Sequence, residues 1–294
     1  MSEAPLCAAP DREPRAPSFA VPPLACDCHL HVFGPAERYP YQPTRGYTPP
    51  DSPPAEMRKL HAALGITRAV LVQASVHGTD NRAILDAVAT DPARLRAVAS
   101  VTEEVMDAEL ERLHAGGVRG FRVNLVDKGG MPFRSLASLE AVAARVRPLG
   151  WHAELLVHVH ESPDFPAIAR RLPVPVCVGH IGYTPAAVAL EHPGYREFLA
   201  LLRDGVCWAK LTGPNRLSSA HRAPYADVAP LARAAVEAAP GRIVWGTDWP
   251  HVMLKGVMPN DGALLDLLAE WVPDEALRHR ILVENPAALY GFDA

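Results

Sequence analysis

Three polar side chains alternate with other residues in the run Cys26-Asp-Cys-His-Leu-His31 near the N-terminus. In an extended strand, Asp27, His29 and His31 would project to one side, because strand side chains alternate with a period of two. Unpaired imidazoles and carboxylates are costly to bury in a dry core. We therefore predict that these three side chains line a cavity.

Two later residues add to this chemistry, since His180 ends one apolar run and Asp248 follows another. A carboxylate beside a trapped water can act as a general base, and imidazoles can polarise a carbonyl and stabilise the oxyanion. Such a set suits hydrolysis of an activated ester. Histidine and carboxylate are also ordinary ligands of zinc and manganese. The candidate catalytic set, His29, His31, His180 and Asp248, is therefore also a candidate divalent-metal site.

Eight short apolar runs alternate with helical patterns along the chain and indicate how these residues are positioned. The predicted strands cover residues 25–31, 68–75, 95–101, 118–124, 151–158, 174–180, 206–212 and 242–246. Strands separated by helices pair in parallel, and eight such units favour an α/β fold of the (β/α)8 TIM-barrel type. A doubly wound sheet would usually carry a Gly-rich phosphate turn after its first strand, and no G-x-G-x-x-G sequence is present.

The first helix predicted between the strands begins at Pro54. Thr79 is expected to cap the second helix, which bears Ile84, Leu85 and Val88. Residues 1–23 form a Pro-rich arm without a periodic apolar pattern, and residues 24–294 form a single barrel domain. The loop at 32–53 is longer than a filler connection, so it is expected to be functional.

The composition limits the classes of function. Hydrophobic residues make up 49% of the 294 residues, charged residues 21%, and the net charge is −4, as in a soluble globular protein. There is no basic stripe for nucleic acid and no apolar run approaching the ~20 residues of a membrane span. The arm lacks the apolar core of a secretory signal. Five cysteines without zinc-ribbon spacing suggest reduced thiols in a cytoplasmic enzyme, with Cys26 and Cys28 packed outward. The composition leaves the oligomeric state open.

Barrel enzymes place their chemistry at the carboxyl ends of the strands, and polar residues gather there in nearly every predicted strand. They add these candidates for substrate binding: Ser75, His77, Thr79, Arg122, Lys128, His158, Arg216 and His251. A lone strand-end histidine such as His77 is more often a hydrogen-bonded loop residue. Lys210 and Glu154 could form a structural bridge inside the barrel as readily as act directly. Arg122 lies within a buried strand, so its charge must meet an anion or a carboxylate.

At these residues the chain resembles the amidohydrolase superfamily, which has H-x-H on strand one, histidine on strand six and aspartate on strand eight. Within it the chain is most similar to the 2-pyrone-4,6-dicarboxylate lactonases, from about residue 26 to residue 291. The motifs that carry the resemblance are His29-Leu-His-Val-Phe-Gly-Pro35, Val72-Gln-Ala-Ser-Val-His-Gly-Thr-Asp-Asn81, Gly117-Val-Arg-Gly-Phe-Arg-Val-Asn124, Gly246-Thr-Asp-Trp-Pro-His251 and Asn285-Pro286. The resemblance implies a lactone hydrolase in which Asp248 activates water and the three histidines hold and polarise the carbonyl, without a bound metal.

The resemblance also implies which residues grip the carboxylates of a dianionic substrate, namely Tyr47, Ser75, Thr79, Arg122 and Arg216. Three positions depart from the pattern. Lys128 stands in place of an arginine, which exchanges a two-pronged donor for a point charge. Leu156 replaces a tyrosine and cannot donate a hydrogen bond. His158 stands where the lactonase has no histidine, and a strand-five histidine is a metal ligand in the metal-dependent amidohydrolases.

The sequence therefore predicts a hydrolase that opens a small anionic lactone from the breakdown of aromatic acids. Pyrone dicarboxylate is the first candidate, followed by muconolactone-type and sugar-acid lactones. One alternative is a metal-dependent decarboxylase of an unsaturated carboxylic acid, a class that the same superfamily contains. Another is a small-molecule binding protein without catalysis, which the intact His and Asp set disfavours.

Overall fold

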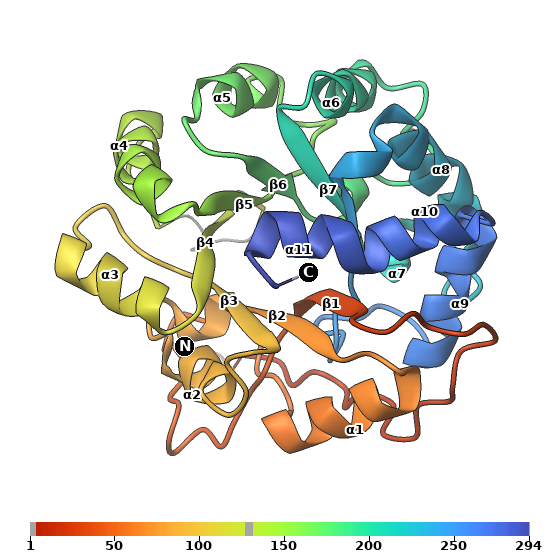
Figure 1. Cartoon of the computed structure of the whole chain (residues 1–294), viewed down its shortest axis with the longest axis horizontal. Helices are drawn as coiled ribbons and strands as arrows, with labels where there is room; N and C mark the ends of the chain where they lie inside the picture. The colour runs from red at the N-terminus through yellow and green to blue at the C-terminus, as the bar shows by residue number, and fades with distance from the viewer. Residues whose placement is uncertain (1–3, 127–131, 294) are drawn as a thin grey trace.

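Eight parallel strands, hydrogen-bonded in sequence order, form a single barrel-shaped sheet in the computed structural model (Figure 1). The structure describes residues 4–126 and 132–293. The strands are β1 (Cys26–Leu30), β2 (Arg68–Val72), β3 (Leu95–Ala99), β4 (Val118–Asn124), β5 (His152–Leu156), β6 (Val176–Val178), β7 (Cys207–Leu211) and β8 (Ile243–Trp245). Each predicted run contains one of them, so the predicted (β/α)8 barrel is confirmed.

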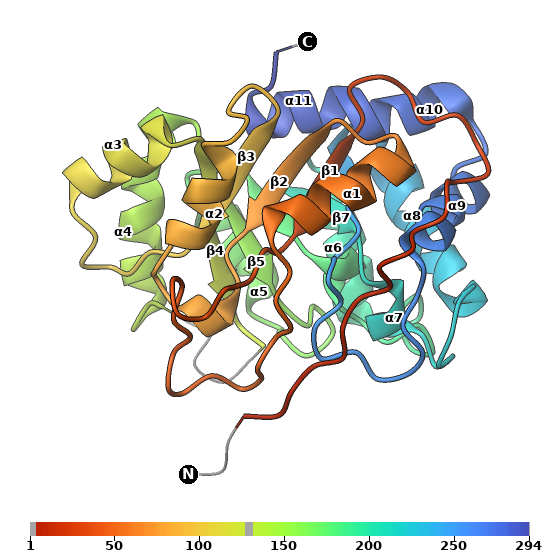
Figure 2. The same ribbon diagram turned by 90° about the horizontal axis from the view of Figure 1, so that it is seen from below.

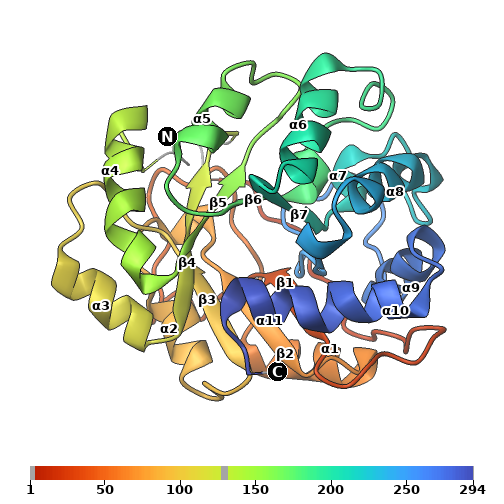
Figure 3. The same ribbon diagram turned by 45° about the horizontal axis from the view of Figure 1, so that its top comes forward.

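Helices surround this sheet as an outer layer (Figures 1 and 3). They are α1 (Pro54–Leu64), α2 (Arg82–Val88), α3 (Asp107–Ala115), α4 (Leu136–Val146), α5 (Phe165–Arg171), α6 (Pro193–Arg203), α7 (Pro214–Leu217), α8 (Ala229–Ala238), α9 (Asp261–Trp271), α10 (Glu275–His279) and α11 (Asn285–Tyr290). In the described part of the chain, none of them is long and apolar enough to cross a bilayer.

The prediction that Thr79 caps the second helix is wrong. Asn81 occupies the cap position of α2, and its side chain makes no capping hydrogen bond. The Asn81 amide instead donates to the carbonyls of Thr79 and Ser100, at 3.1 and 2.9 Å. An amide placed there satisfies two loop carbonyls, so it ties the loop after β2 to the end of β3.

The predicted facing of the β1 side chains is also only partly correct. Cys26 and Cys28 lie in an apolar cluster with inward residues of other strands, among them Val70 and Cys177, and do not pack outward. Asp27 faces α1, where its Oδ2 lies 3.3 Å from the Nε2 of His61. The pairing of β1 with β2 shifts register between Asp27 and Leu30, and this irregularity lets His29 turn into the lumen.

The two ends of the barrel serve different purposes. α11 lies across one end, where the Phe292 ring that follows it packs against the guanidinium groups of Arg68 and Arg96, at the starts of β2 and β3 (Figure 1). The closure from β8 back to β1 is made at the opposite end. There the Asp248 N–H donates to the His29 carbonyl and the His31 N–H to the Trp249 carbonyl, both at 2.8 Å. The chain thus completes its barrel with the same residues that the sequence proposes for chemistry.

Candidate active site

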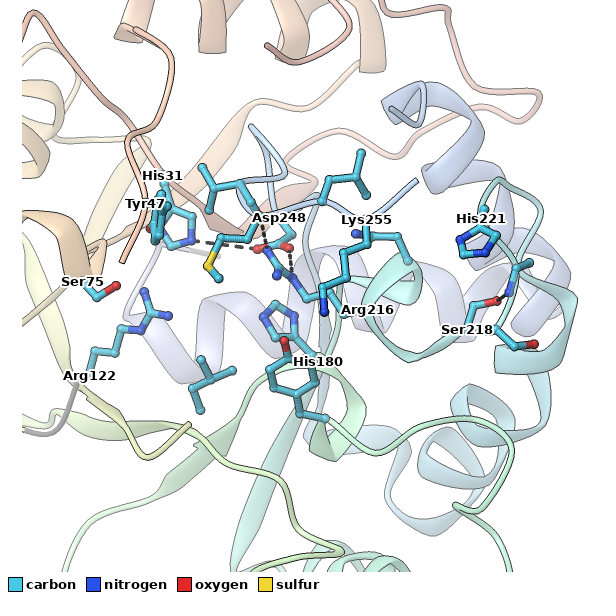
Figure 4. A pocket seen from close by; sticks show the side chains of 18 residues that line it. His31, Tyr47, Ser75, Arg122, His180, Arg216, Ser218, His221, Asp248 and Lys255 are labelled. Atoms are coloured by element: carbon cyan, nitrogen blue, oxygen red, sulfur yellow. Dashed lines mark hydrogen bonds and ion pairs between the residues drawn. The ribbon is translucent and has the colours of Figure 1, made fainter. Parts of the chain in front are cut away.

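Asp248 lies at the centre of the site and is 1% exposed. Its Oδ2 accepts a hydrogen bond from the Nε of Arg216 at 2.7 Å. Its Oδ1 lies 3.6 Å from the Nε2 of His29 and 3.9 Å from the Nε2 of His31, without a hydrogen-bond partner of its own. Figure 4 shows Asp248 between His31 and Arg216, with His180 below it. One carboxylate oxygen is therefore held by a cation, and the other is left for a ligand.

The second nitrogen of two imidazoles is fixed by a neighbour. The Nδ1 of His31 lies 2.8 Å from the Val72 carbonyl, and the Nδ1 of His180 lies 2.8 Å from the Thr212 hydroxyl. A carbonyl can only accept, so the Nδ1 of His31 carries the proton and its Nε2 is an acceptor. These second contacts orient both rings and leave each Nε2 for chemistry.

Asp27 forms hydrogen bonds with residues beside the site and does not face the cavity. Its carboxylate accepts from the backbone N–H of Thr247 at 3.0 Å and from the Thr247 hydroxyl at 2.7 Å. It also accepts from the N–H of His29 at 3.2 Å. Asp27 therefore joins the end of β8 to β1 just before Asp248, as expected for a residue that orients its neighbours.

A second buried ion pair lies deeper in the lumen. The Nζ of Lys210 donates to Glu154 Oε2 at 2.5 Å and to the Cys28 carbonyl at 2.7 Å. The Nδ1 of His29 lies 3.1 Å from Glu154 Oε1 and 3.3 Å from the same Nζ. The bridge that the sequence left open is formed, and it supports the ring of His29 from beneath.

The surroundings set the charges of these groups. Burial alone would raise the pKa of Asp248, but Arg216 and the neighbouring imidazoles bring it well below its usual range. Burial lowers the pKa of His31 and of His180 well below their usual value, and Arg122 and Arg216 act in the same direction. The site at neutral pH therefore holds an ionised carboxylate among neutral imidazoles.

These groups open into a cavity of about 390 Å³, a size typical of small-molecule sites. From the predicted set, His31, Tyr47, Ser75, Arg122, His180, Arg216 and Asp248 line it. Leu156, which replaces a tyrosine of the lactonases, also lies in its wall. The cavity brings together residues from the ends of β1, β2, β4, β5, β6, β7 and β8.

The whole barrel matches a known protein family, described as Amidohydrolase, over residues 26–292. The chain belongs to the amidohydrolase family. A 2-pyrone-4,6-dicarboxylate hydrolase of Comamonas testosteroni is 39% identical to it over 285 residues, which cover 94% of this chain and 93% of that one. The recognition of the family and of the pyrone-dicarboxylate branch from the sequence is thus confirmed.

Two further relatives of this amidohydrolase show how far the similarity extends. A 4-sulfomuconolactone hydrolase of Hydrogenophaga intermedia is 37% identical over 289 residues, covering 98% of this chain and 95% of its own. The crystal structure of an Agrobacterium tumefaciens protein without ligand superposes with a TM-score of 0.84. It is 33% identical and covers 94% of this chain and 99% of its own.

Of the three β1 side chains predicted to line a cavity, only His31 borders the main one, and Asp27 and His29 are not among its lining residues. Four further predicted residues do not line the main cavity of the amidohydrolase either. Thr79 lines a neighbouring cavity of about 410 Å³, which shares Tyr47, Ser75 and Met253 with the main one. The other three are histidines with other neighbours. His77 packs against the rings of Phe33 and Tyr41. The Nδ1 of His158 lies 2.9 Å from Glu161 Oε2, and the Nε2 of His251 lies 2.9 Å from Asp261 Oδ1. A histidine that follows a strand is thus not sufficient to mark the site. Lys128 lies outside the described residues.

Several residues that line the cavity were not predicted as site residues: Tyr183, Asn215, Ser218, Ser219, His221 and Lys255. All of them follow β6, β7 or β8, with Asn215 in the short helix α7 and the others outside the α-helices, and some lie ten or more residues beyond the strand end. The rule that barrel loops build the site could have suggested these segments. Which of their side chains turn inward depends on how the loops fold back, and no local pattern encodes that.

The site has the donors that a divalent ion requires. Ligand atoms of His29, His180 and Asp248 all lie within 4.8 Å of one another, the one such group among the described residues. Two of these residues contribute buried atoms without a hydrogen-bond partner, His29 Nε2 and Asp248 Oδ1. Two imidazoles and a carboxylate suit zinc or manganese. Of the residues predicted as ligands, His31 lies outside this group, and His158 is not part of it.

Proposed function

We propose that this amidohydrolase hydrolyses the ring ester of a small anionic lactone, with 2-pyrone-4,6-dicarboxylate as the first candidate and muconolactone-type lactones next. The observation that carries the proposal is the half-satisfied carboxylate of Asp248, buried and open on its Oδ1 side toward His29 and His31. The relatives named as lactone hydrolases support the same class of reaction.

In this mechanism, Asp248 and His31 hold the hydrolytic water. Both Asp248 Oδ1 and the Nε2 of neutral His31 accept hydrogen bonds, so they take the two protons of one water and leave its lone pair for the carbonyl carbon. Asp248 removes a proton as the C–O bond to the water oxygen forms. The ring C–O bond then breaks, and that proton passes to the leaving oxygen to give a hydroxyl group. The carboxylic acid formed at the same time ionises and releases the second proton of the water to solvent.

His180 supplies the donor for the developing oxyanion. The Thr212 hydroxyl accepts from the backbone N–H of His180 at 3.2 Å, so its own proton is available to the Nδ1 of that ring. The imidazole proton then sits on Nε2, which faces the cavity and can donate to the lactone carbonyl oxygen. A donor already in place at this oxygen is worth a factor of roughly 10² to 10³ in kcat.

The charges around the cavity favour an anionic substrate. Asp248 is balanced by Arg216. Two further cations on the wall, Arg122 and Lys255, form no salt bridge with any carboxylate of the described residues. Arg122 instead donates to the Gln73 carbonyl at 2.7 Å, which leaves its other N–H groups for a ligand. A cavity with an excess of cations attracts anions and raises their local concentration.

A divalent ion, when bound, would be held by His29, His180 and Asp248, and would supply Lewis-acid polarisation of the lactone carbonyl.

The proposal is tested by adding the purified protein to a panel of lactones and following acid release with a pH indicator. The panel includes pyrone dicarboxylate, muconolactones and sugar-acid lactones, with neutral lactones as the control for charge. We expect acid release with anionic lactones and little with neutral ones. Failure to open any lactone would overturn the proposal. Release of carbon dioxide from an unsaturated acid, abolished by a chelator, would favour the decarboxylase instead.

A further inference from the structure

We propose that the N-terminal strap, defined as residues 4–7, positions two walls of the active site by tying the loop between β1 and α1 to the loop between β8 and α9. The strap lies in the arm that the sequence sets apart from the barrel. The kinetic part of the argument rests on the proposed function, because lactone hydrolysis is its readout. The structural part does not.

The strap pairs with Thr48 like a short added strand. The N–H of Cys7 donates to the Thr48 carbonyl at 2.9 Å, and the N–H of Thr48 donates to the Pro5 carbonyl at 2.8 Å. The Thr48 hydroxyl reaches the Ala4 carbonyl at 3.2 Å. The backbone N–H, the carbonyl and the hydroxyl of Thr48 thus all contact the strap, and the hydroxyl also accepts from the Nε of Arg45 at 3.0 Å. The next residue back along the chain, Tyr47, is 7% exposed and lines both cavities.

The other end of the tie is on the loop that follows Asp248. The backbone N–H of Met253 donates to the Sγ of Cys7 at 3.3 Å. The Cys7 side chain also packs against an apolar cluster that contains Tyr47 and Val252. One cysteine therefore contacts both loops. Met253 itself lies in the wall between the two cavities.

The loop held by Cys7 is coupled to the reacting groups. The Val252 carbonyl, one residue before Met253, accepts from the Nη2 of Arg216 at 3.0 Å. The Nε of the same guanidinium donates to Asp248. A shift of residues 252–253 would therefore move the group that holds the catalytic carboxylate.

The strap is not a free end, because the chain that follows it is pinned to the barrel. Asn260, the N-cap of α9, donates to Asp11 at 2.8 Å and to the Glu13 carbonyl at 3.0 Å. Ser18 bonds the carboxylate of Asp266 through both its N–H and its hydroxyl. Figure 2 shows the arm running from the end opposite α11 past α1 to β1. In contrast, the Leu6 side chain is 83% exposed, so the strap is not placed there to bury apolar surface.

The test is a variant that lacks residues 2–8, compared with the full chain by steady-state kinetics on the best lactone and by amide hydrogen exchange. We expect KM to rise about tenfold and kcat to fall several-fold, because loosened walls weaken binding and also shift the Val252 carbonyl that helps to hold Arg216 beside Asp248. We also expect faster exchange at the amides of Thr48 and Met253. A lower melting temperature with KM and both amides unchanged would mean a structural role only and would overturn the proposal.

Substitutions at Cys7 keep the test decisive if the shortened chain does not fold. Cys7→Val keeps the apolar bulk but cannot accept from Met253, whereas Cys7→Ser keeps an acceptor. We expect about a threefold higher KM for the valine variant and a near-normal KM for the serine variant. Leu6→Ala is the matched control and should behave as the parent. Equal KM values for all three would contradict the proposal. If no lactone is opened at all, the proposed function fails, and amide exchange alone decides on the strap.

Discussion

Two carboxylate–cation pairs lie close to one another in the described part of the barrel, and only one of them borders the cavity. In the inner pair, the Nζ of Lys210 lies 2.5 Å from Glu154 Oε2 in the lumen, and Lys210 is completely buried. In the outer pair, the Nε of Arg216 lies 2.7 Å from Asp248 Oδ2 at the cavity wall. In the inner pair, Lys210 also donates to the Cys28 carbonyl, and Glu154 Oε1 lies 3.1 Å from His29 Nδ1. In the outer pair, Asp248 has no hydrogen-bond partner on Oδ1 and borders the cavity.

This difference shows that the ion pair itself does not decide the role. Both carboxylates have a pKa well below the usual value, because a cation outweighs the effect of burial. What separates them is access, since Asp248 borders a cavity and Glu154 does not. A buried pair without access is a structural support, and a buried pair with one open oxygen is a candidate base.

The largest effect is expected from removing the negative charge of the Asp248 carboxylate. Asp248→Asn keeps the size of the side chain but cannot take a proton, so we expect kcat to fall by roughly 10³-fold with the fold intact. Steady-state rates on the best lactone and circular dichroism measure this. Glu154→Gln is the matched change in the inner pair, and a loss of kcat as large as that in Asp248→Asn would erase the distinction between the pairs.

The next effect concerns stability and belongs to the inner pair. Lys210→Met leaves the Glu154 charge buried without its cation, so the free energy of unfolding should fall by about 3–5 kcal/mol. Urea denaturation measures the loss. The double variant Glu154→Gln, Lys210→Met removes both charges and should recover most of it. If the double variant is no more stable than the single one, charge pairing is not what Lys210 provides.

A third prediction uses the pH dependence of activity to distinguish two roles of Arg216, lowering the pKa of Asp248 and binding the substrate. Arg216 lowers the pKa of Asp248, so Arg216→Gln should raise that pKa. The base is active when ionised, and its activity is lost as the pH falls through its pKa. The acid limb of the profile of kcat/KM against pH should therefore move to higher pH in Arg216→Gln. A lower kcat/KM with an unmoved limb would show that Arg216 serves the substrate alone.

The smallest effect is expected at Lys255, the exposed cation of the cavity. Lys255→Met should raise KM for a dianionic lactone about two- to fivefold and leave kcat unchanged, since exposed charges interact weakly. Adding salt should shrink the difference, and Lys255→Arg should restore the parent KM. A salt-independent change would mean that Lys255 acts through packing instead of charge.

The barrel could be predicted because its signals are local. Each strand is an apolar run of strand length, each helix carries its own apolar face, and the order of the two fixes a parallel sheet. The rule that chemistry gathers at the strand ends then places His29, His31, His180 and Asp248 together before any coordinates are known. His77, His158 and His251 satisfy the same rule but do not line the cavity, because they contact Phe33, Glu161 and Asp261 instead.

The sequence by itself therefore determined the architecture and the family and proposed the candidate catalytic set, since all three depend on periodicity and on motifs within short stretches. The tertiary structure decided which side chains of β1 face inward, because an irregular register cannot be seen in an alternating pattern. It also decided that Arg216 holds Asp248, that Lys210 holds Glu154, and that Cys7 joins two loops of the site. These contacts join residues 32 to 246 positions apart, and only the closure of the barrel brings them within reach.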